Sequence, residues 1–219
     1  MKRTLLFVLA LIAVGCAEPI PRNLDDLSMQ GPQYLDPETL EPYSGPAYRM
    51  SEDDSTQIVL RVNLRDGRFH GDFEDFEPEA VVDGSLGIYQ TGTYRDGQRE
   101  GRFEYFYPSG VLRGRGTYEN GEEEGPYESW HENGEPRSKI TYAAGELDGP
   151  FEFYYENGQL EEKGTFTAGE LDGPFESYHE NGQLEQRGTA NMGQKCGEWI
   201  EDGETVTFDP CPPGLADGN

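Results

Sequence analysis

The chain has 219 residues, enough for one ordinary domain or one extended repeat array, and only 34% of them are hydrophobic, which is low for a globular core. A formal net charge of −26 repels nucleic acid and anionic lipid headgroups, which excludes both as expected partners, whereas it attracts cations and basic proteins. Aromatic residues make up 12% and 29 glycines are spread along the chain, a combination that argues against disorder and favours short strands joined by tight turns.

The first 15 residues have the pattern of a secretory signal peptide. Lys2 and Arg3 precede an apolar run over residues 5–14, which is too short for a stable transmembrane helix. Small residues then lead into Cys16, and this ending resembles the lipobox of bacterial lipoproteins. The resemblance implies that Cys16 receives a diacylglycerol, that the new N-terminus is acylated, and that palmitate is taken up as a membrane anchor. The alternative is a signal peptide cut elsewhere, with Cys16 left as an ordinary thiol.

Ala17 follows the cysteine, where an aspartate in enteric-type bacteria resembles an inner-membrane retention signal. We therefore expect a lipid-anchored protein at the outer membrane, facing the periplasm or the exterior, if the host has two membranes. Behind the lipidated cysteine, residues 16–40 show little periodic hydrophobicity and are predicted to be a flexible tether. The prolines of this segment are Pro19, Pro21, Pro32 and Pro37.

From Gly97 to Trp199 the sequence matches itself without gaps when it is shifted by about 24 residues. The recurring columns include glycines at 97, 121, 145, 169 and 193, and the aromatic residues Phe103, Tyr127, Phe151, Phe175 and Trp199. So many coincident columns indicate a repeat protein. We expect the array to run from about residue 41 to 208 in six or seven units, with an insertion within 77–92 and a C-terminal tail over 209–219.

The turn residues indicate that each unit is one antiparallel hairpin. Asn133-Gly134 and its equivalents are the dipeptides that type I′ hairpin turns favour, and a second turn lies half a unit away, as at Asn120-Gly121. Two turns per unit leave two strands, so the chain meanders, and each unit advances the sheet by roughly 10 Å. Pro126 and its equivalents cannot donate to the strand ladder, which predicts a bulge or a strand entry there.

The segment Tyr155–Leu160, followed by Gly164–Phe166 and Gly169–Gly173, resembles the bacterial variant of the MORN (membrane occupation and recognition nexus) repeat. The resemblance implies an all-β fold, an elongated single-layer twisted antiparallel meander of hairpin repeats that serves as a scaffold or binding surface. Some bacterial members carry the label of a YwqK-like antitoxin family, from which this sequence departs by its export signal. Eukaryotic members have been linked to phospholipids, which the acidic balance of this chain disfavours.

The repeated aromatic columns have two interpretations. Stacked rings from successive units form the core that no single hairpin can form alone, or they form an exposed platform for glycans. Core packing is the stronger interpretation, with Tyr154 and Tyr178 as the residues of another aromatic column that remain exposed.

No sequence motif indicates catalysis, a cofactor or a metal site, because nucleophile elbows, phosphate loops and complete metal-ligand patterns are lacking. His131 and His179 occupy one column two units apart, too far for one metal ion to bridge. A repeated glutamate column is interpreted as a solvated stripe, with a stripe for divalent cations or a basic ligand as the alternative. This column consists of Glu104, Glu128, Glu152 and Glu176.

With Cys16 acylated, Cys196 and Cys211 are left as an even pair in an oxidising compartment. A two-residue type II′ turn at Gly203-Glu204 places these two cysteines opposite each other, which predicts a disulfide. Pro210 is the residue that can disturb this register.

These observations favour a membrane-anchored, non-catalytic repeat scaffold that binds a protein partner in the cell envelope. The partner is expected to have a basic surface, and an antitoxin-like or immunity protein is a special case. The candidate contact residues are the glutamate column together with Tyr154 and Tyr178. The alternative function is a glycan-binding or cell-wall-binding protein that uses exposed aromatic columns.

Overall fold

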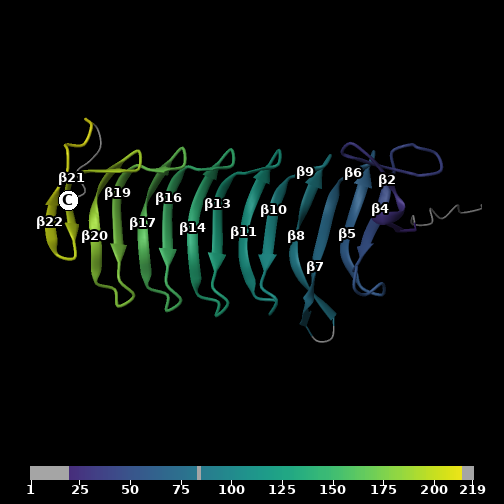
Figure 1. Ribbon diagram of the computed structural model, residues 1–219, viewed down its shortest axis with the longest axis horizontal. Coiled ribbons are helices and arrows are strands. Elements are labelled where there is room, and N and C mark those ends of the chain that lie inside the picture. The colour runs from purple at the N-terminus through teal and green to yellow at the C-terminus, as the bar shows by residue number, and fades with distance from the viewer. Residues whose placement is uncertain (1–19, 83–84, 214–219) are drawn as a thin grey trace, which may run out of the picture.

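The computed structural model describes residues 20–82 and 85–213. The predicted signal peptide, the lipidation candidate Cys16 and the end of the tail lie outside the described residues. Within them the protein is an elongated array of β-strands that follow one another in chain order along the long axis (Figure 1). One sheet holds 20 strands, and all its pairings are antiparallel except that of the first strand with the fourth. No helix in the described part of the chain is long and apolar enough to cross a membrane.

The N-terminal elements are β1 (Arg22–Asn23), the 3-10 helix η1 (Leu24–Asp26), β2 (Ser28–Gln30), β3 (Gln33–Leu35), β4 (Gly45–Met50), β5 (Ile58–Arg65), β6 (Arg68–Phe69), β7 (Gly71–Val82) and β8 (Ser85–Arg95). The central elements are β9 (Gln98–Arg99), β10 (Gly101–Phe106), β11 (Leu112–Glu119), β12 (Glu122–Glu123), β13 (Gly125–Trp130), β14 (Pro136–Ala143), β15 (Glu146–Leu147) and β16 (Gly149–Tyr154). The last elements are β17 (Leu160–Thr167), β18 (Glu170–Leu171), β19 (Gly173–Tyr178), β20 (Leu184–Asn191), β21 (Gln194–Glu201) and β22 (Glu204–Thr207).

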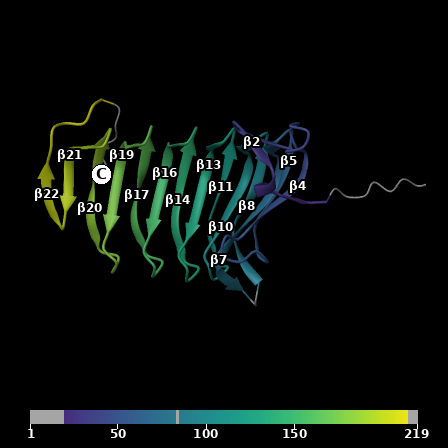
Figure 2. The same cartoon turned by 45° about the vertical axis from the view of Figure 1, so that its right-hand side comes forward.

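Each regular unit contains a long strand, a tight turn, a two-residue strand and a six-residue strand. In one such unit β11 pairs with the short β12, and β13 then pairs with β14 along its whole length. Pro126 stands at the second position of β13, which confirms the predicted strand entry. The bulge lies further along the strand, between Ser129 and Trp130. The all-β single-layer meander predicted from the sequence is therefore the observed fold (Figures 1 and 2).

Type I′ turns close the hairpins along the upper edge of the array in Figure 1. The φ angles are 53° and 92° at Asn120–Gly121, and 49° and 80° at Ala144–Gly145. Positive φ at both central positions defines this turn, whose twist matches that of the paired strands. The same turns join the units, because the Gly145 N–H donates to the Glu123 carbonyl at 2.9 Å. Since alanine rarely adopts positive φ, the repeat rather than the local sequence imposes this geometry.

The Asn-Gly turns on the opposite edge are not of type I′, which corrects the prediction from the sequence. Gly134 has a φ of 88°, whereas Asn133 is not at positive φ. The Gly134 N–H donates to the His131 carbonyl and the His131 N–H donates to the Glu135 carbonyl, which is a three-residue loop with a type I turn and a left-handed glycine. Asn133 instead serves through its side chain, whose Oδ1 accepts from the Glu135 N–H and whose Nδ2 donates to the Glu156 carbonyl of the next unit.

One face of the sheet, called the aromatic face, carries the column Phe103, Tyr127, Phe151, Phe175 and Trp199. Phe103 and Trp199 are 0% and 1% exposed. Their rings cover glycines of a neighbouring strand, and a Cβ at Gly92 would lie 2.7 Å from the Phe103 ring. This column is therefore core, and the lack of a side chain at the facing glycine lets a single-layer sheet bury it.

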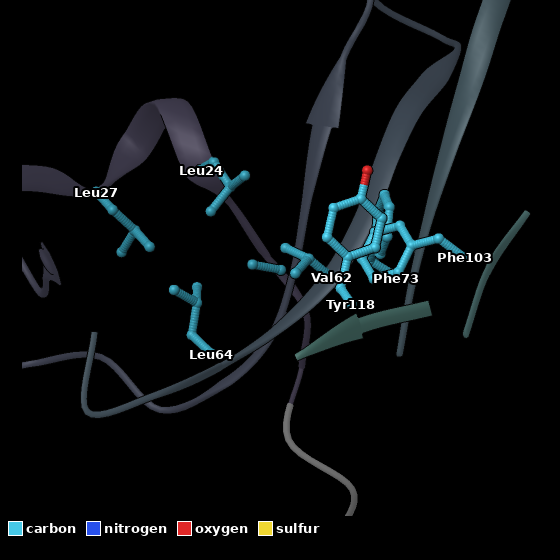
Figure 3. Packing of buried hydrophobic residues seen from close by; sticks show 8 residues of the cluster. Leu24, Leu27, Val62, Leu64, Phe73, Phe103 and Tyr118 are labelled. Carbon is cyan, nitrogen blue, oxygen red and sulfur yellow. The ribbon is translucent and has the colours of Figure 1, made fainter. Parts of the chain in front are cut away.

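The residues before the array correct the predicted tether. β1 pairs with β4, and the β2–β3 hairpin is tied to the first units by the Tyr34 N–H, which donates to the Gly67 carbonyl at 2.8 Å. Leu24 and Leu27 are buried, and they belong to the cluster that continues through Val62 (Figure 3). The segment Arg22–Leu35 is thus an N-terminal cap that covers the first described unit on the aromatic face, and not a flexible tether.

The predicted insertion within 77–92 falls in the hairpin of β7 and β8. These two strands are longer than those of the regular units, and their paired lower ends reach beyond the lower edge of the array in Figure 1. The insertion therefore lengthens one hairpin and leaves the order of strands unchanged.

The last hairpin turns one residue earlier than predicted. Asp202 and Gly203 have φ angles of 48° and 85°, a type I′ turn, and Glu201 pairs with Glu204. The predicted type II′ turn at Gly203-Glu204 is therefore wrong. Aspartate followed by glycine is the better type I′ sequence, since both residues tolerate positive φ.

Cys196 and Cys211 nevertheless form a disulfide, with their Cα atoms 4.9 Å apart. The chain continues along β21 after β22 has ended, because the Gly197 N–H donates to the Asp209 carbonyl at 2.8 Å. Pro210 lies in this continuation, after the last strand, where no ladder hydrogen bond is required of it. The crosslink closes the last unit of the described chain.

Candidate functional site

The face opposite the aromatic face carries the predicted glutamate column, and the structure places a cation beside each member. Arg115 lies opposite both Glu104 and Glu128, and the same relation repeats along the sheet. The resulting line, called the charge ladder, alternates in sign across successive strands. Its members are Glu104, Arg115, Glu128, Lys139, Glu152, Lys163, Glu176 and Arg187.

Ion pairs join the ladder between neighbouring strands. The N–O distances are 2.6 Å for Arg115–Glu128, 3.1 Å for Lys139–Glu152 and 2.8 Å for Lys163–Glu176. Hydrogen bonds from Tyr154 and Lys139 lower the pKa of Glu152, and hydrogen bonds from Lys163 and Tyr178 lower the pKa of Glu176. The predicted stripe is thus half-exposed and internally balanced. It does not present a row of unpaired carboxylates to a ligand.

Tyr154 and Tyr178 lie on the ladder face, half-buried, as part of the same line. Each hydroxyl donates to the glutamate two residues earlier, Glu152 or Glu176. The Lys139 ammonium lies 5.3 Å from the centre of the Tyr154 ring, and the Arg115 guanidinium lies 5.1 Å from that of Trp130. Neighbouring cations therefore contact these aromatic rings, which a glycan would need free for stacking.

The unbalanced negative charge lies elsewhere, along the edge with the type I′ turns between residues 119 and 172. We call the acidic residues along this edge, which are named below, the acidic edge. Among the described residues, no lysine or arginine forms an ion pair with any of them. Glu122, Glu146 and Glu170 are exposed at equivalent positions of three successive units. The acidic edge consists of Glu119, Glu122, Glu123, Glu124, Glu146, Asp148, Glu170 and Asp172.

Part of the acidic edge also has a structural role. The Ala144 N–H donates to the Glu124 carboxylate at 2.9 Å, and the Met192 N–H donates to the Asp172 carboxylate at 3.3 Å. Each of these carboxylates thus binds the turn of the following unit. Glu122, Glu146 and Glu170 are the members best placed for an external contact, because they are exposed beside the turns.

His131 and His179 each contact the neighbouring unit of the repeat. The His131 Nε2 lies 2.8 Å from the Tyr154 carbonyl oxygen of the next unit, and His179 lies beside Asp202. Tyr107 and Tyr155 occupy the same column and donate to the equivalent carbonyl oxygens. No group of three potential metal ligands is found within residues 20–82 and 85–213.

The cations of the ladder are the residues that the sequence interpretation missed. Arg115, Lys139, Lys163 and Arg187 recur at the spacing of the glutamates and would have been found by the same shift of the sequence. The pairing could not be read directly, because the two columns lie eleven or thirteen residues apart and meet only through the strand register.

Comparison with protein families identifies four consecutive matches to the model of the MORN repeat variant, at residues 99–120, 123–144, 147–168 and 171–191. Each match runs from a two-residue strand through one hairpin to the next type I′ turn. The matches confirm the predicted repeat over the regular units, although they cover less than half of the chain. A comparison with curated proteins finds no match.

Proposed function

We propose that this array of MORN-type repeats is a membrane-tethered, non-catalytic scaffold that binds a protein partner with a basic surface in the cell envelope. The observation that carries the proposal is the acidic edge, where exposed carboxylates recur in successive units and none forms an ion pair with a described lysine or arginine. Association with such an edge is fast at low ionic strength and slows as salt screens the charges.

The arrangement of the side chains supports binding over catalysis. Catalysis requires dissimilar groups that converge on one reacting atom, whereas a repeat distributes similar groups along a surface. Glu122, Glu146 and Glu170 occur at intervals of one unit, or roughly 10 Å, and together extend over roughly 20 Å. That length suits an extended contact with a folded partner.

We place the proposed contact at the edge of the sheet and not on the glutamate column. Glu128, Glu152 and Glu176 are already paired with cations, so a basic partner would have to displace them. The exposed members of the acidic edge require no such exchange. An immunity or antitoxin-like role, in which the edge covers a basic toxin, is one form of the same proposal.

The anchor in this proposal is Cys16, whose sequence context resembles a lipobox. Several acyl chains hold a protein stably at a membrane because each buried CH₂ contributes about 0.8 kcal/mol. We infer delivery to the outer membrane from Ala17, if the host has two membranes. The N-terminal cap then lies at the membrane-proximal end of the described chain, and the acidic edge extends away from it (Figure 1).

Affinity capture from crosslinked envelopes tests the proposal with the full-length protein. We expect a protein partner with a basic surface to copurify, and the Cys16→Ser variant to leave the membrane fraction and lose that partner. Capture of nothing beyond an untagged control, or hydrolysis of a glycan or ester by the purified protein, would contradict the proposal. Binding of cell-wall fragments followed by Trp130 fluorescence would support the glycan alternative instead.

A further inference from the structure

A hollow of about 600 Å³ opens in the aromatic face, at the end of β13 and β14 that lies towards the Asn-Gly turns. It lies on a different surface from the acidic edge. The side chains of Tyr127 and Phe153 line the part of the hollow over the middle of the strands, and charged side chains line the part near the turns. A volume of this size accommodates a small organic ligand or a short peptide.

The hollow exists because one small residue, Ser129, replaces the large aromatic residues of the neighbouring units. Ser129 stands in the column that holds Tyr105 one unit earlier and Phe153 one unit later. It pairs across the strands with Ser138, and the two hydroxyl oxygens lie 2.6 Å apart. The ring that fills this level of the face in the units on either side is therefore missing, and the two serine hydroxyl groups form a polar floor in its place.

Two arginines reach the hollow from the bulged starts of their strands. Arg113 contacts the Tyr89 ring, and Arg137 is exposed. Neither guanidinium has an ion-pair partner among the described side chains, which is notable in a protein of net charge −26. These are cations that the fold leaves available for an anionic group.

The opposite end of the hollow carries the reverse charge. Glu161 occupies the column of Arg113 and Arg137 one unit later, and Glu162 lies next to it. Burial raises the pKa of Glu162, and the neighbouring carboxylates of Glu161 and Glu185 raise it further. A cation placed there would relieve this repulsion, so the lining is balanced overall and separated into a positive and a negative end.

We propose that this hollow binds a short zwitterionic peptide, with its carboxylate at Arg137 and Arg113 and its ammonium group at Glu161 and Glu162. The mixed charge disfavours nucleic acids and polyphosphates, which the glutamates would repel. Arg137 and Glu161 lie one unit apart, or roughly 10 Å between their backbones. An extended chain gains about 3.3–3.6 Å per residue, so a peptide of about three residues matches this separation.

Calorimetric titration of the full-length protein with trialanine tests the site. We expect saturable binding, and binding about tenfold weaker for either the C-terminal amide or the N-acetyl derivative, since each removes one charge-assisted interaction. The Arg137→Ala variant should also bind about tenfold more weakly. The matched control is Arg68→Ala, which removes one exposed arginine on the other edge and should bind as the wild type does.

The Ser129→Phe variant tests the hollow itself, because it introduces the residue that the next unit carries at this position. We expect a folded protein, judged by its circular dichroism, that no longer binds trialanine. No saturable binding to the wild type would overturn the proposal. Wild-type affinity in Arg137→Ala, or in folded Ser129→Phe, would also overturn it. None of these results depends on the partner proposed for the acidic edge.

Discussion

The indole ring of Trp199 lies directly over Gly188, where a Cβ atom would stand 2.2 Å from the ring carbon Cδ2. The ring is 1% exposed, and its Nε1 donates to the Thr189 carbonyl at 2.9 Å and to the Cys196 carbonyl at 3.1 Å. These hydrogen bonds fix the ring against the sheet, so it cannot move aside for a larger residue.

We therefore predict that Gly188→Ala lowers the free energy of unfolding by about 1–3 kcal/mol through overpacking. Urea unfolding followed by circular dichroism measures the loss. In the Trp199→Leu background the same substitution should cost less, because the obstructing ring is gone. An unchanged midpoint for Gly188→Ala alone would show that the ring does not hold the position seen in the structure.

The terminal disulfide should stabilise the last hairpin. Replacing Cys196 and Cys211 by alanine opens a crosslink between residues 15 apart, which we expect to cost about 3 kcal/mol. Hydrogen exchange should rise in β21 and β22 and remain unchanged in β11–β14. Reduction of the wild type provides the control and should give the same loss. If reduced and oxidised proteins unfold at the same urea concentration, the crosslink contributes nothing.

The charge ladder predicts that the stability cost of a charge reversal depends on where the residue lies and not only on the change in net charge. Glu152→Lys places a lysine between Lys139 and Lys163, replacing an ion pair by like charges, and should cost about 1 kcal/mol. Glu156→Lys makes the same charge change at an exposed turn and should have little effect. The difference in melting temperature between the two variants should shrink at high salt. Equal destabilisation by both variants would contradict a specific ladder.

The raised pKa of Glu162 predicts that this residue lowers the stability of the folded protein as the pH rises. The ladder residues Glu152 and Glu176 have lowered pKa values and should have the opposite effect. The charged form of Glu162 is disfavoured in the folded protein, so its cost is absent below the ordinary pKa of 4.5 and appears as the pH rises above it. Glu162→Gln should therefore raise the melting temperature at neutral pH and lose this gain in acid. A gain that is the same at both pH values would indicate a packing effect instead of a charge effect.

The architecture could be predicted from the sequence because the same turn and core residues recur in every unit of the repeat. Turn glycines and core aromatics recur in every unit, so the hairpins and the buried column could be found without a structure. Single features were less accessible. Leu24 and Leu27 have no repeated pattern, and their role as a cap follows only from their contacts with the first units.

For the candidate sites too, repeated residues could be found from the sequence, whereas their contacts could not. The glutamate column was visible, but its neutralisation depends on strand register, which brings Lys139 between Glu128 and Glu152. The last turn was misplaced because Gly203 can belong to either of two overlapping turns. The hollow required knowing that Ser129 and Ser138 face each other across two strands.

The most direct test of the proposed function compares the two edges of the sheet in the same capture experiment. One variant changes Glu122, Glu146 and Glu170 to lysine on the acidic edge. Its control changes the exposed Glu132, Glu156 and Glu180 to lysine on the opposite edge, with the same change in net charge. Both variants should retain the circular dichroism of the wild type.

We predict that the acidic-edge variant loses the envelope partner, whereas the control captures it at the wild-type level and with the same salt dependence. Equal capture by both folded variants would contradict the central claim, because the carboxylates of the acidic edge would then act only to keep the protein soluble.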